Sequence, residues 1–280
     1  MTASPHVNYA STSRFVQTGQ TRIHYHEAGV GPVLLCLHGG APGAFGWGNF
    51  GRNLEALSRH FRVLIADLPG YGQSDKPAVE GDRNAFYART FHDMLSALGI
   101  ESAHVLGMAT GGAIAIRMAL DFPEKIDRLV LVSAAGGLSN YSVKPQKTAS
   151  QIYYGGSGPS LEKMRDYLYQ LVFDPALVTD EVVRERYEAS VEPEFMVQAP
   201  EGRSSKRHTP ESLWKEVDRI RARTLIVWGR ENRVQNFENA VFLHGRIRDS
   251  EMHVFGQCGL WVPYEKSQAF NELVQTFLLR

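Results

Sequence analysis

Short apolar runs alternate with longer stretches of helical periodicity along most of this chain. Runs of strand length occur at 33–37 and in FRVLIADLPGYG, HVLGMA, RLVLVSAA, TLIVWG and MHVFG. Apolar residues at helical spacing occur at 49–58, 84–98, 238–246 and 265–279. RFVQTG and TRIHYHEAG predict an opening antiparallel hairpin. This alternation is typical of a mostly parallel sheet flanked by helices, so the expected fold class is α/β.

The pattern changes between residues 136 and 212. GGLSNYSVKP and YYGGSGPS are loop-like, whereas LEKMRDYLYQLVF and EVVRERYEAS have the spacing of amphipathic helices. No strand pattern interrupts these helices. We therefore predict an α/β core in two parts, 1–135 and 213–280, with a helical cap inserted over 136–212.

Composition excludes several classes of protein. Lys and Arg together number 30 and so do Asp and Glu, so no basic field attracts nucleic acid. The first residues show no signal-peptide pattern, and no apolar run approaches the roughly 20 residues that span a bilayer. The two cysteines, Cys36 and Cys258, are too few for a disulfide framework and are interpreted as thiols in a reducing compartment. We expect a cytoplasmic protein without a metal or cofactor.

The segment GMATGG has the form of a nucleophile elbow, the tight turn between a strand and a helix that presents a catalytic side chain. Gly107 and Gly111 give room for the turn, but its apex is Ala109. Any glycine-rich strand-to-helix turn is the alternative interpretation. The upstream loop LHGGAPGA favours the elbow, because the backbone N–H groups of Gly40 and Ala41 could stabilise a developing oxyanion together with that of Thr110.

On these motifs the chain resembles the meta-cleavage product hydrolases, α/β-hydrolases that cleave a carbon–carbon bond in ring-opened dienoates. The similar segments include YHEAGVGPVLLCLHGGAPGA, NFGRNLEALSRHFRVLIADLPGYGQSDKP, LIVWGRENRV and VFGQCGLWVPYEK, in the expected order. The resemblance implies the α/β-hydrolase fold, with an eight-stranded sheet, a helical cap and a pocket between them.

The resemblance also implies a serine, an aspartate and a histidine at three positions that are Ala109, Asn232 and Leu260 in this chain. Alanine has no oxygen to attack with, asparagine has no charge to stabilise an imidazolium, and leucine transfers no proton. The sequence therefore predicts that the family mechanism of hydrolysis is absent. Natural divergence explains three such changes better than an engineered trap variant does.

Side chains that could replace the lost groups each have an ordinary structural explanation. His38 would order its loop, His104 and His253 would be satisfied core histidines, and Cys258 would be an inert buried thiol. Glu231 would be a loop charge, and the hydroxyl of Thr110 is a weak candidate.

A second set of positions retains what the resemblance assigns to ligand binding. Arg186 aligns with a cap arginine that grips the 2-oxo or carboxylate end of the substrate, and a guanidinium suits that bidentate role. A solvated helix face is the alternative for Arg186. The predicted ligand-binding residues are Asn49, Met108, Ala109, Arg186, Asn232, Leu260 and Trp261.

Three functions follow as hypotheses. The first is a cofactor-free, non-hydrolytic enzyme of cyclase, isomerase or lyase type, acting on a hydrophobic conjugated oxo or carboxylate compound derived from a polyketide or an aromatic. The second is a non-catalytic binder of such a small molecule. The third is a pseudoenzyme partner of an active hydrolase. We expect no nucleic acid or membrane partner, and a homodimer or larger homo-oligomer is compatible with the resemblance.

Overall fold

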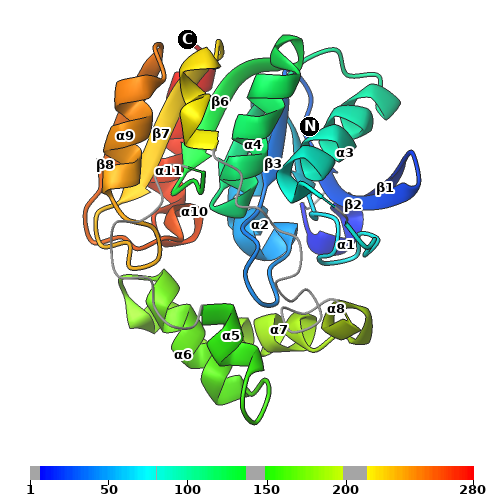
Figure 1. Ribbon diagram of the computed structural model, residues 1–280, viewed down its shortest axis with the longest axis vertical. Coiled ribbons are helices and arrows are strands. Elements are labelled where there is room, and N and C mark those ends of the chain that lie inside the picture. The colour runs from blue at the N-terminus through cyan, green and yellow to red at the C-terminus, as the bar shows by residue number, and fades with distance from the viewer. Residues whose placement is uncertain (1–6, 80, 137–148, 198–212) are drawn as a thin grey trace, which may run out of the picture.

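The computed structural model describes residues 7–79, 81–136, 149–197 and 213–280. These residues form an eight-stranded sheet in the order β1-β2-β4-β3-β5-β6-β7-β8 (Figure 1). Only β2 runs antiparallel to its neighbours, which confirms the predicted α/β-hydrolase sheet. The strands are β1 Ser13–Thr18, β2 Thr21–Ala28, β3 Val33–Leu37, β4 Arg62–Ala66, β5 Ala103–Met108, β6 Ile126–Val132, β7 Arg223–Gly229 and β8 Ser250–Phe255.

The register of the central strands brings three segments of the chain to one edge of the sheet. Leu37 at the end of β3 pairs with Ala66 of β4 and with Gly107 of β5. The residues that follow these strands, among them His38, Asp67 and Ala109, therefore start from the same carboxyl edge. This is the edge at which parallel α/β sheets place their ligands.

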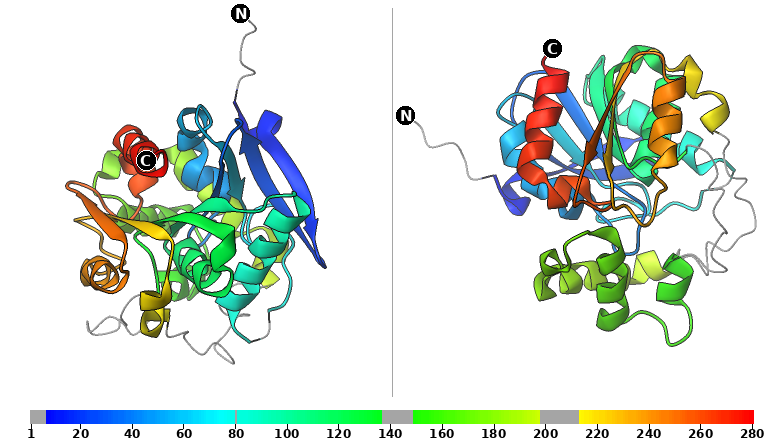
Figure 2. Two further views of the ribbon diagram at one scale, coloured as in Figure 1. Left: turned by 90° about the horizontal axis from the view of Figure 1, so that it is seen from above. Right: turned by 90° about the vertical axis from the view of Figure 1, so that its left-hand side faces the viewer.

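Helices cover both faces of the sheet, as Figure 2 shows from above and from the side. One face carries α2 (Gly46–Leu57), α10 (Val262–Glu265) and α11 (Ser267–Leu278), and the other carries α3 (Arg83–Ala97), α4 (Thr110–Asp121) and α9 (Glu238–Arg246). The short helix α1 (Tyr9–Thr12) precedes β1. Single 3-10 turns stand at Pro123–Lys125, Pro175–Leu177, Leu213–Lys215 and Val217–Arg219.

Two predicted helix bounds differ from those observed. The helix expected over 49–58 begins earlier, at Gly46, because the Asp67 carboxylate accepts a hydrogen bond from the Gly46 N–H and so supplies the partner that the first turn needs. The helix expected over 265–279 is two helices, since the chain breaks at Lys266 (φ −119°, ψ 34°). Glu265 thereby belongs to α10, where its carboxylate accepts from Gly259 N–H at 2.7 Å.

Four helices lie together beyond the carboxyl edge of the strands (Figures 1 and 2). They are α5 (Ala149–Tyr154), α6 (Leu161–Leu171), α7 (Asp180–Ser190) and α8 (Pro193–Val197). They occupy the sequence range in which the cap was predicted. Segments 137–148 and 198–212, which hold the predicted junctions of cap and core and most of GGLSNYSVKP, lie outside the described residues. The boundaries at 136 and 212 therefore stay a prediction.

The two cysteines lie apart in the core as buried free thiols. Burial raises the pKa of both, so each is protonated at neutral pH. No helix among the described residues is long and apolar enough to cross a membrane.

Candidate active site

The turn between β5 and α4 has the geometry of an elbow. Ala109 stands at its apex with φ 48° and ψ −112°, a backbone conformation that costs about 1–3 kcal/mol for a residue with a side chain. Its neighbours leave no space for side chains: a Cβ on Gly107 would lie 2.2 Å from the Gly111 carbonyl oxygen, and one on Gly111 would lie 2.1 Å from that of Leu37. The two glycines are therefore required for the turn.

The glycine-rich loop after β3 lies beside this elbow. A Cβ on Gly39 would be 3.4 Å from the Cβ of Ala109, in ordinary contact. The N–H groups of Gly40 and Ala41 donate to no described backbone carbonyl, and Thr110 is the first residue of α4, whose N–H has no partner within the helix. All three residues line one cavity, so their free donors are available to an oxyanion there.

His38 orders this loop, as predicted. Its Nδ1 donates to the Gly39 carbonyl at 2.8 Å and its Nε2 accepts from the Leu68 N–H at 3.0 Å. Complete burial lowers the pKa of His38 to about 4, so the ring is neutral in this role. Both ring nitrogens are occupied, which leaves His38 unable to act as a base towards a ligand.

The cavity between the elbow, the loop and the cap has a volume of about 400 Å³. Six of the predicted ligand-binding residues line it: Asn49, Met108, Ala109, Arg186, Leu260 and Trp261. It also contains residues that sequence reasoning missed: Gly39, Tyr167, Leu171, Val234 and Gln235. Tyr167 and Leu171 are four apart on α6 and thus share a face, but only the docking of that helix on the core shows which face meets the cavity.

Arg186 on α7 is the charged side chain of this cavity. The residue is 2% exposed, and its Nε has no hydrogen-bond partner among the described residues, nor does its guanidinium form an ion pair with any of them. Its Cζ lies 5.4 Å from the centre of the Trp261 ring. Burial lowers the pKa of Arg186, and burial also raises the pKa of Tyr167 to about 12. Burial of a cation without an ion pair is costly, and an anion in the cavity would offset that cost.

The cap approaches the glycine-rich loop at backbone distance. Gly43 has φ 61°, and a Cβ on it would lie 1.9 Å from the Arg186 carbonyl oxygen. No other residue type fits this approach. The backbone of α7 is thereby seated directly on the loop that carries the free N–H donors.

Asn232 does not line the cavity, in contrast to the prediction. Its Oδ1 accepts from the N–H groups of Val234 and Gln235, both at 2.9 Å, which turns the side chain back onto its own loop. Its Nδ2 is buried without a partner among the described residues. Asn232 therefore shapes the segment that brings Val234 and Gln235 to the cavity wall.

The remaining candidates have structural environments. Glu231 accepts from the Cys258 N–H at 3.0 Å, and burial and Glu265 keep the Cys258 thiol neutral. His104 is buried in β5, and burial lowers its pKa. The expectation of a core histidine is wrong for His253, because β8 is the edge strand. His253 is exposed, and its ring lies 4.4 Å from that of Phe255 at an interplanar angle of 59°.

Comparison with known proteins identifies the relatives of this chain. The family model described as the alpha/beta hydrolase fold matches residues 32–267. The 2-hydroxy-6-oxononadienedioate/2-hydroxy-6-oxononatrienedioate hydrolase of Comamonas testosteroni is 34% identical over 97% of this chain and 98% of its own. The 2-hydroxy-6-oxo-6-phenylhexa-2,4-dienoate hydrolase of Burkholderia cepacia is 34% identical over 96% and 97%. The meta-cleavage product hydrolase of Pseudomonas fluorescens IP01, solved with acetates, is 32% identical over 96% and 98%, with a TM-score of 0.83.

These comparisons correct the functional prediction. Relatives that match nearly the whole chain are named as hydrolases of 2-hydroxy-6-oxo compounds or of meta-cleavage products, and none of those described above is named as a cyclase, an isomerase, a lyase or a pseudoenzyme. The prediction of a non-hydrolytic enzyme, with a binder or pseudoenzyme as alternatives, is therefore wrong. Three side chains led to that prediction, whereas the relatives match 96–97% of the chain.

Proposed function

We propose, on the premise that this chain belongs to the α/β-hydrolase fold family, that it hydrolyses a carbon–carbon bond in a ring-opened 2-hydroxy-6-oxo dienoate. One observation carries the proposal: the buried guanidinium of Arg186 and the free N–H donors of Gly40 and Thr110 line the same cavity of about 400 Å³. A conjugated compound with a carboxylate at one end and a ketone further along offers a partner to each.

The carboxylate of the substrate is held by Arg186, and its 6-oxo oxygen accepts from the backbone donors. Both interactions are made by groups that are ordered before the ligand binds, which is the condition for strong electrostatic stabilisation. Asn49 and Trp261, which also line the cavity, complete the polar and the flat walls around a conjugated chain.

The bond cleavage balances with water as the co-reactant. The 2-hydroxyl proton moves to C5, which gives a 2,6-dioxo compound, and water adds to the C6 carbonyl. The C5–C6 bond then breaks, and its electron pair passes along the conjugated chain to the 2-oxo oxygen, which takes up a proton. The products are a carboxylic acid and 2-hydroxypenta-2,4-dienoate. The backbone donors stabilise the oxyanion that water creates at C6.

Ala109, Asn232 and Leu260 stand where the family resemblance implies the catalytic triad, so water rather than a side chain attacks C6 in this proposal. Oxyanion donors and binding alone can accelerate a hydrolysis by roughly 10³–10⁴ over water. The expected enzyme is therefore slow and is limited by proton transfer.

The test is a paired assay on the coloured compound 2-hydroxy-6-oxo-6-phenylhexa-2,4-dienoate. The purified protein is compared with the triple variant Ala109→Ser, Asn232→Asp, Leu260→His and with Arg186→Gln. We expect the protein to release benzoate and 2-hydroxypentadienoate faster than buffer does, the triple variant to be at least about 100-fold faster, and Arg186→Gln to lose affinity.

The outcomes separate the two parts of the proposal. Binding without product above the buffer rate would show that the hydrolytic activity is wrong. Absence of binding would show that the substrate class is wrong, since the cavity would then accept a different anion.

A further inference from the structure

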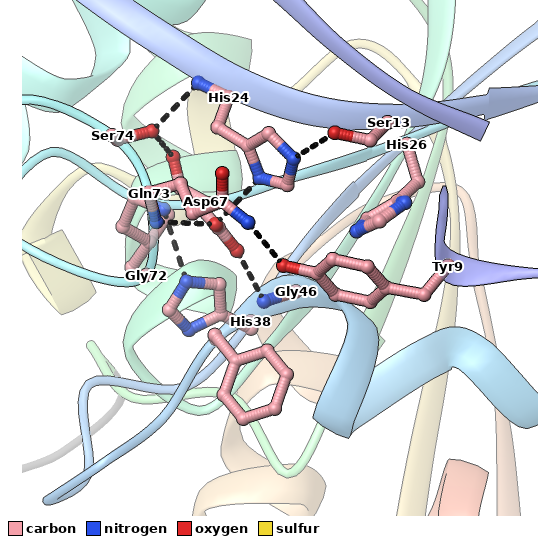
Figure 3. Close-up of polar contacts among 12 residues, drawn as sticks. Tyr9, Ser13, His24, His26, His38, Gly46, Asp67, Gly72, Gln73 and Ser74 are labelled. Atoms are coloured by element: carbon pink, nitrogen blue, oxygen red, sulfur yellow. Dashed lines mark hydrogen bonds and ion pairs between the residues drawn. The ribbon is translucent and has the colours of Figure 1, made fainter. Parts of the chain in front are cut away.

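A buried carboxylate lies directly behind the glycine-rich loop. Asp67, the first residue after β4, is 2% exposed and accepts three hydrogen bonds. The donors are the N–H of Gly46 at 2.6 Å, the N–H of Gln73 at 2.9 Å and Nδ1 of His24 at 2.8 Å (Figure 3). Asp67 does not line the cavity, so it acts on a ligand only through other residues.

His24 connects this carboxylate to the first strand. The ring is fully buried, and its Nε2 lies 2.9 Å from the hydroxyl of Ser13 (Figure 3). When the Ser13 hydroxyl donates to Nε2, the ring N–H is the one on Nδ1, which faces Asp67. The backbone N–H of His24 also donates to Ser74 Oγ, and that hydroxyl donates to the Asp67 carbonyl.

The loop of free N–H donors is fixed at both ends to this neighbourhood. At its start, His38 Nε2 accepts from the N–H of Leu68, the residue after Asp67. At its end, the N–H of Gly46 donates to Asp67 itself and begins α2, which carries Asn49 to the cavity. Between these two anchors, the Tyr71 hydroxyl donates to the Gly40 carbonyl at 3.1 Å.

We propose that Asp67 and His24 are positioning residues that hold the donor loop 39–46, and with it the oxyanion donors, in the geometry the ligand meets. The carboxylate sets where the loop ends, and the imidazole sets which way the carboxylate points.

A charged carboxylate is needed because all three partners are donors. An amide at position 67 would offer one acceptor atom and turn an NH₂ group towards N–H donors, leaving buried donors unsatisfied. Burial alone would raise the pKa of Asp67, but the bonds from His24 and Gly46 and the nearby His38 ring hold it below the usual value. Space is equally restricted, since a Cβ on Gly72 would lie 2.1 Å from Asp67 Oδ2.

Amide hydrogen exchange tests the proposal without depending on any substrate. In Asp67→Asn and His24→Leu we expect the hydrogen-bonded amides of Ala44 and Gly46 to exchange about tenfold faster or more, while the amides of β3 and β5 keep their rates. His24→Asn is the matched control, because an asparagine amide can place its N–H near the position of Nδ1 and should restore the slow exchange. Ser13→Ala is the milder variant should Asp67→Asn fail to fold.

Three results of this experiment would contradict the proposed positioning roles. Wild-type exchange of the Ala44 and Gly46 amides in His24→Leu would overturn the proposal, and so would an equal acceleration in all strands, which indicates a general loss of stability. Equal effects of His24→Asn and His24→Leu would show that the ring fills space and donates nothing of consequence.

A spectroscopic readout adds the link to the ligand and rests on the proposed function. The dienoate probe should show a red-shifted absorption when its ketone accepts from the loop, and His24→Leu should lose that shift while Arg186 retains most of the affinity. Failure of the unaltered protein to bind the probe would contradict the proposed function only, since the exchange experiment decides the positioning roles independently.

Discussion

At the scale of one residue, the buried guanidinium of Arg186 opposes the stability of the ligand-free fold. A guanidinium buried without an anion has lost its hydration and gained no full replacement, and the flat face of Trp261 compensates only in part. In the proposed function, the carboxylate of the substrate supplies the missing charge. The strain of Ala109 at the elbow is a second cost of the same kind.

Replacing Arg186 by methionine should therefore separate the stability of the ligand-free protein from its affinity for a ligand. We expect Arg186→Met to raise the free energy of unfolding of the ligand-free protein by about 1 kcal/mol, because the desolvated charge is removed and similar volume is kept. The same variant should bind the dienoate probe about 10- to 100-fold more weakly, since charge-assisted bonds are lost. Urea unfolding and spectral titration measure the two effects. A large loss of stability would mean that the guanidinium has a partner within the fold.

At the scale of elements, the β5–α4 elbow depends on backbone packing rather than on its apex side chain. Gly107 and Gly111 allow the strand and the helix to approach each other and β3 at distances that exclude a Cβ. The elbow therefore persists with alanine at position 109 because the glycines, not the nucleophile, determine the turn.

Glycine substitutions give a contrast within one protein. Gly107→Ala and Gly111→Ala should each lower the free energy of unfolding by more than about 2 kcal/mol, because a methyl group would overlap backbone atoms. Gly245→Ala in α9 is the control, since nothing lies within 4 Å of its Cβ position, and alanine should stabilise that helix by up to about 1 kcal/mol. Thermal unfolding of the three variants decides what controls the change in stability: the space around each glycine or the loss of a glycine as such.

The elements were predictable where local pattern determines them. Strand β3 and helix α9 follow directly from apolar spacing, and GMATGG indicates the elbow because its glycines are fixed by the turn. The cavity wall was only partly predictable. Whether Tyr167 and Gln235 line the cavity depends on how separate segments of the chain dock on the core. The role of Asp67 was not predictable, because its donors come from three segments and DLPGYG has the composition of an ordinary turn.

At the scale of the whole molecule, buried neutral histidines make the fold sensitive to acid. His26 lies among the rings of Tyr9, His24 and Trp47. The Thr12 hydroxyl donates to the Asn8 carbonyl, so His26 Nδ1 donates to Thr12, and its Nε2 is buried without a partner in the described structure. Burial lowers the pKa of His26 to about 4 from an ordinary value of 6.5.

The sign of the pH dependence follows from this shift. Between pH 6.5 and about 4 the unfolded chain binds a proton that the folded protein excludes, so the free energy of unfolding falls as the pH falls through this window. His38, with a pKa also lowered to about 4, contributes in the same direction. His26→Asn should keep the bond to Thr12 and reduce the loss of stability between pH 7 and pH 4.5 by more than about 1 kcal/mol. Urea unfolding at the two pH values measures this loss. If His26→Asn loses as much stability as the unaltered protein, His26 is not a source of the pH dependence.

The backbone contact at Gly43 also bears on how the pocket could be redesigned. Since α7 rests on the loop without an intervening side chain, the distance between the backbone of Arg186 and the free N–H groups of the loop is set by the path of the main chain. Exchanging side chains of the cavity wall leaves this backbone distance unchanged. On the proposed function, acceptance of larger or smaller substrates is to be engineered at the wall formed by Leu171, Val234 and Gln235, which line the cavity and lie outside the donor loop.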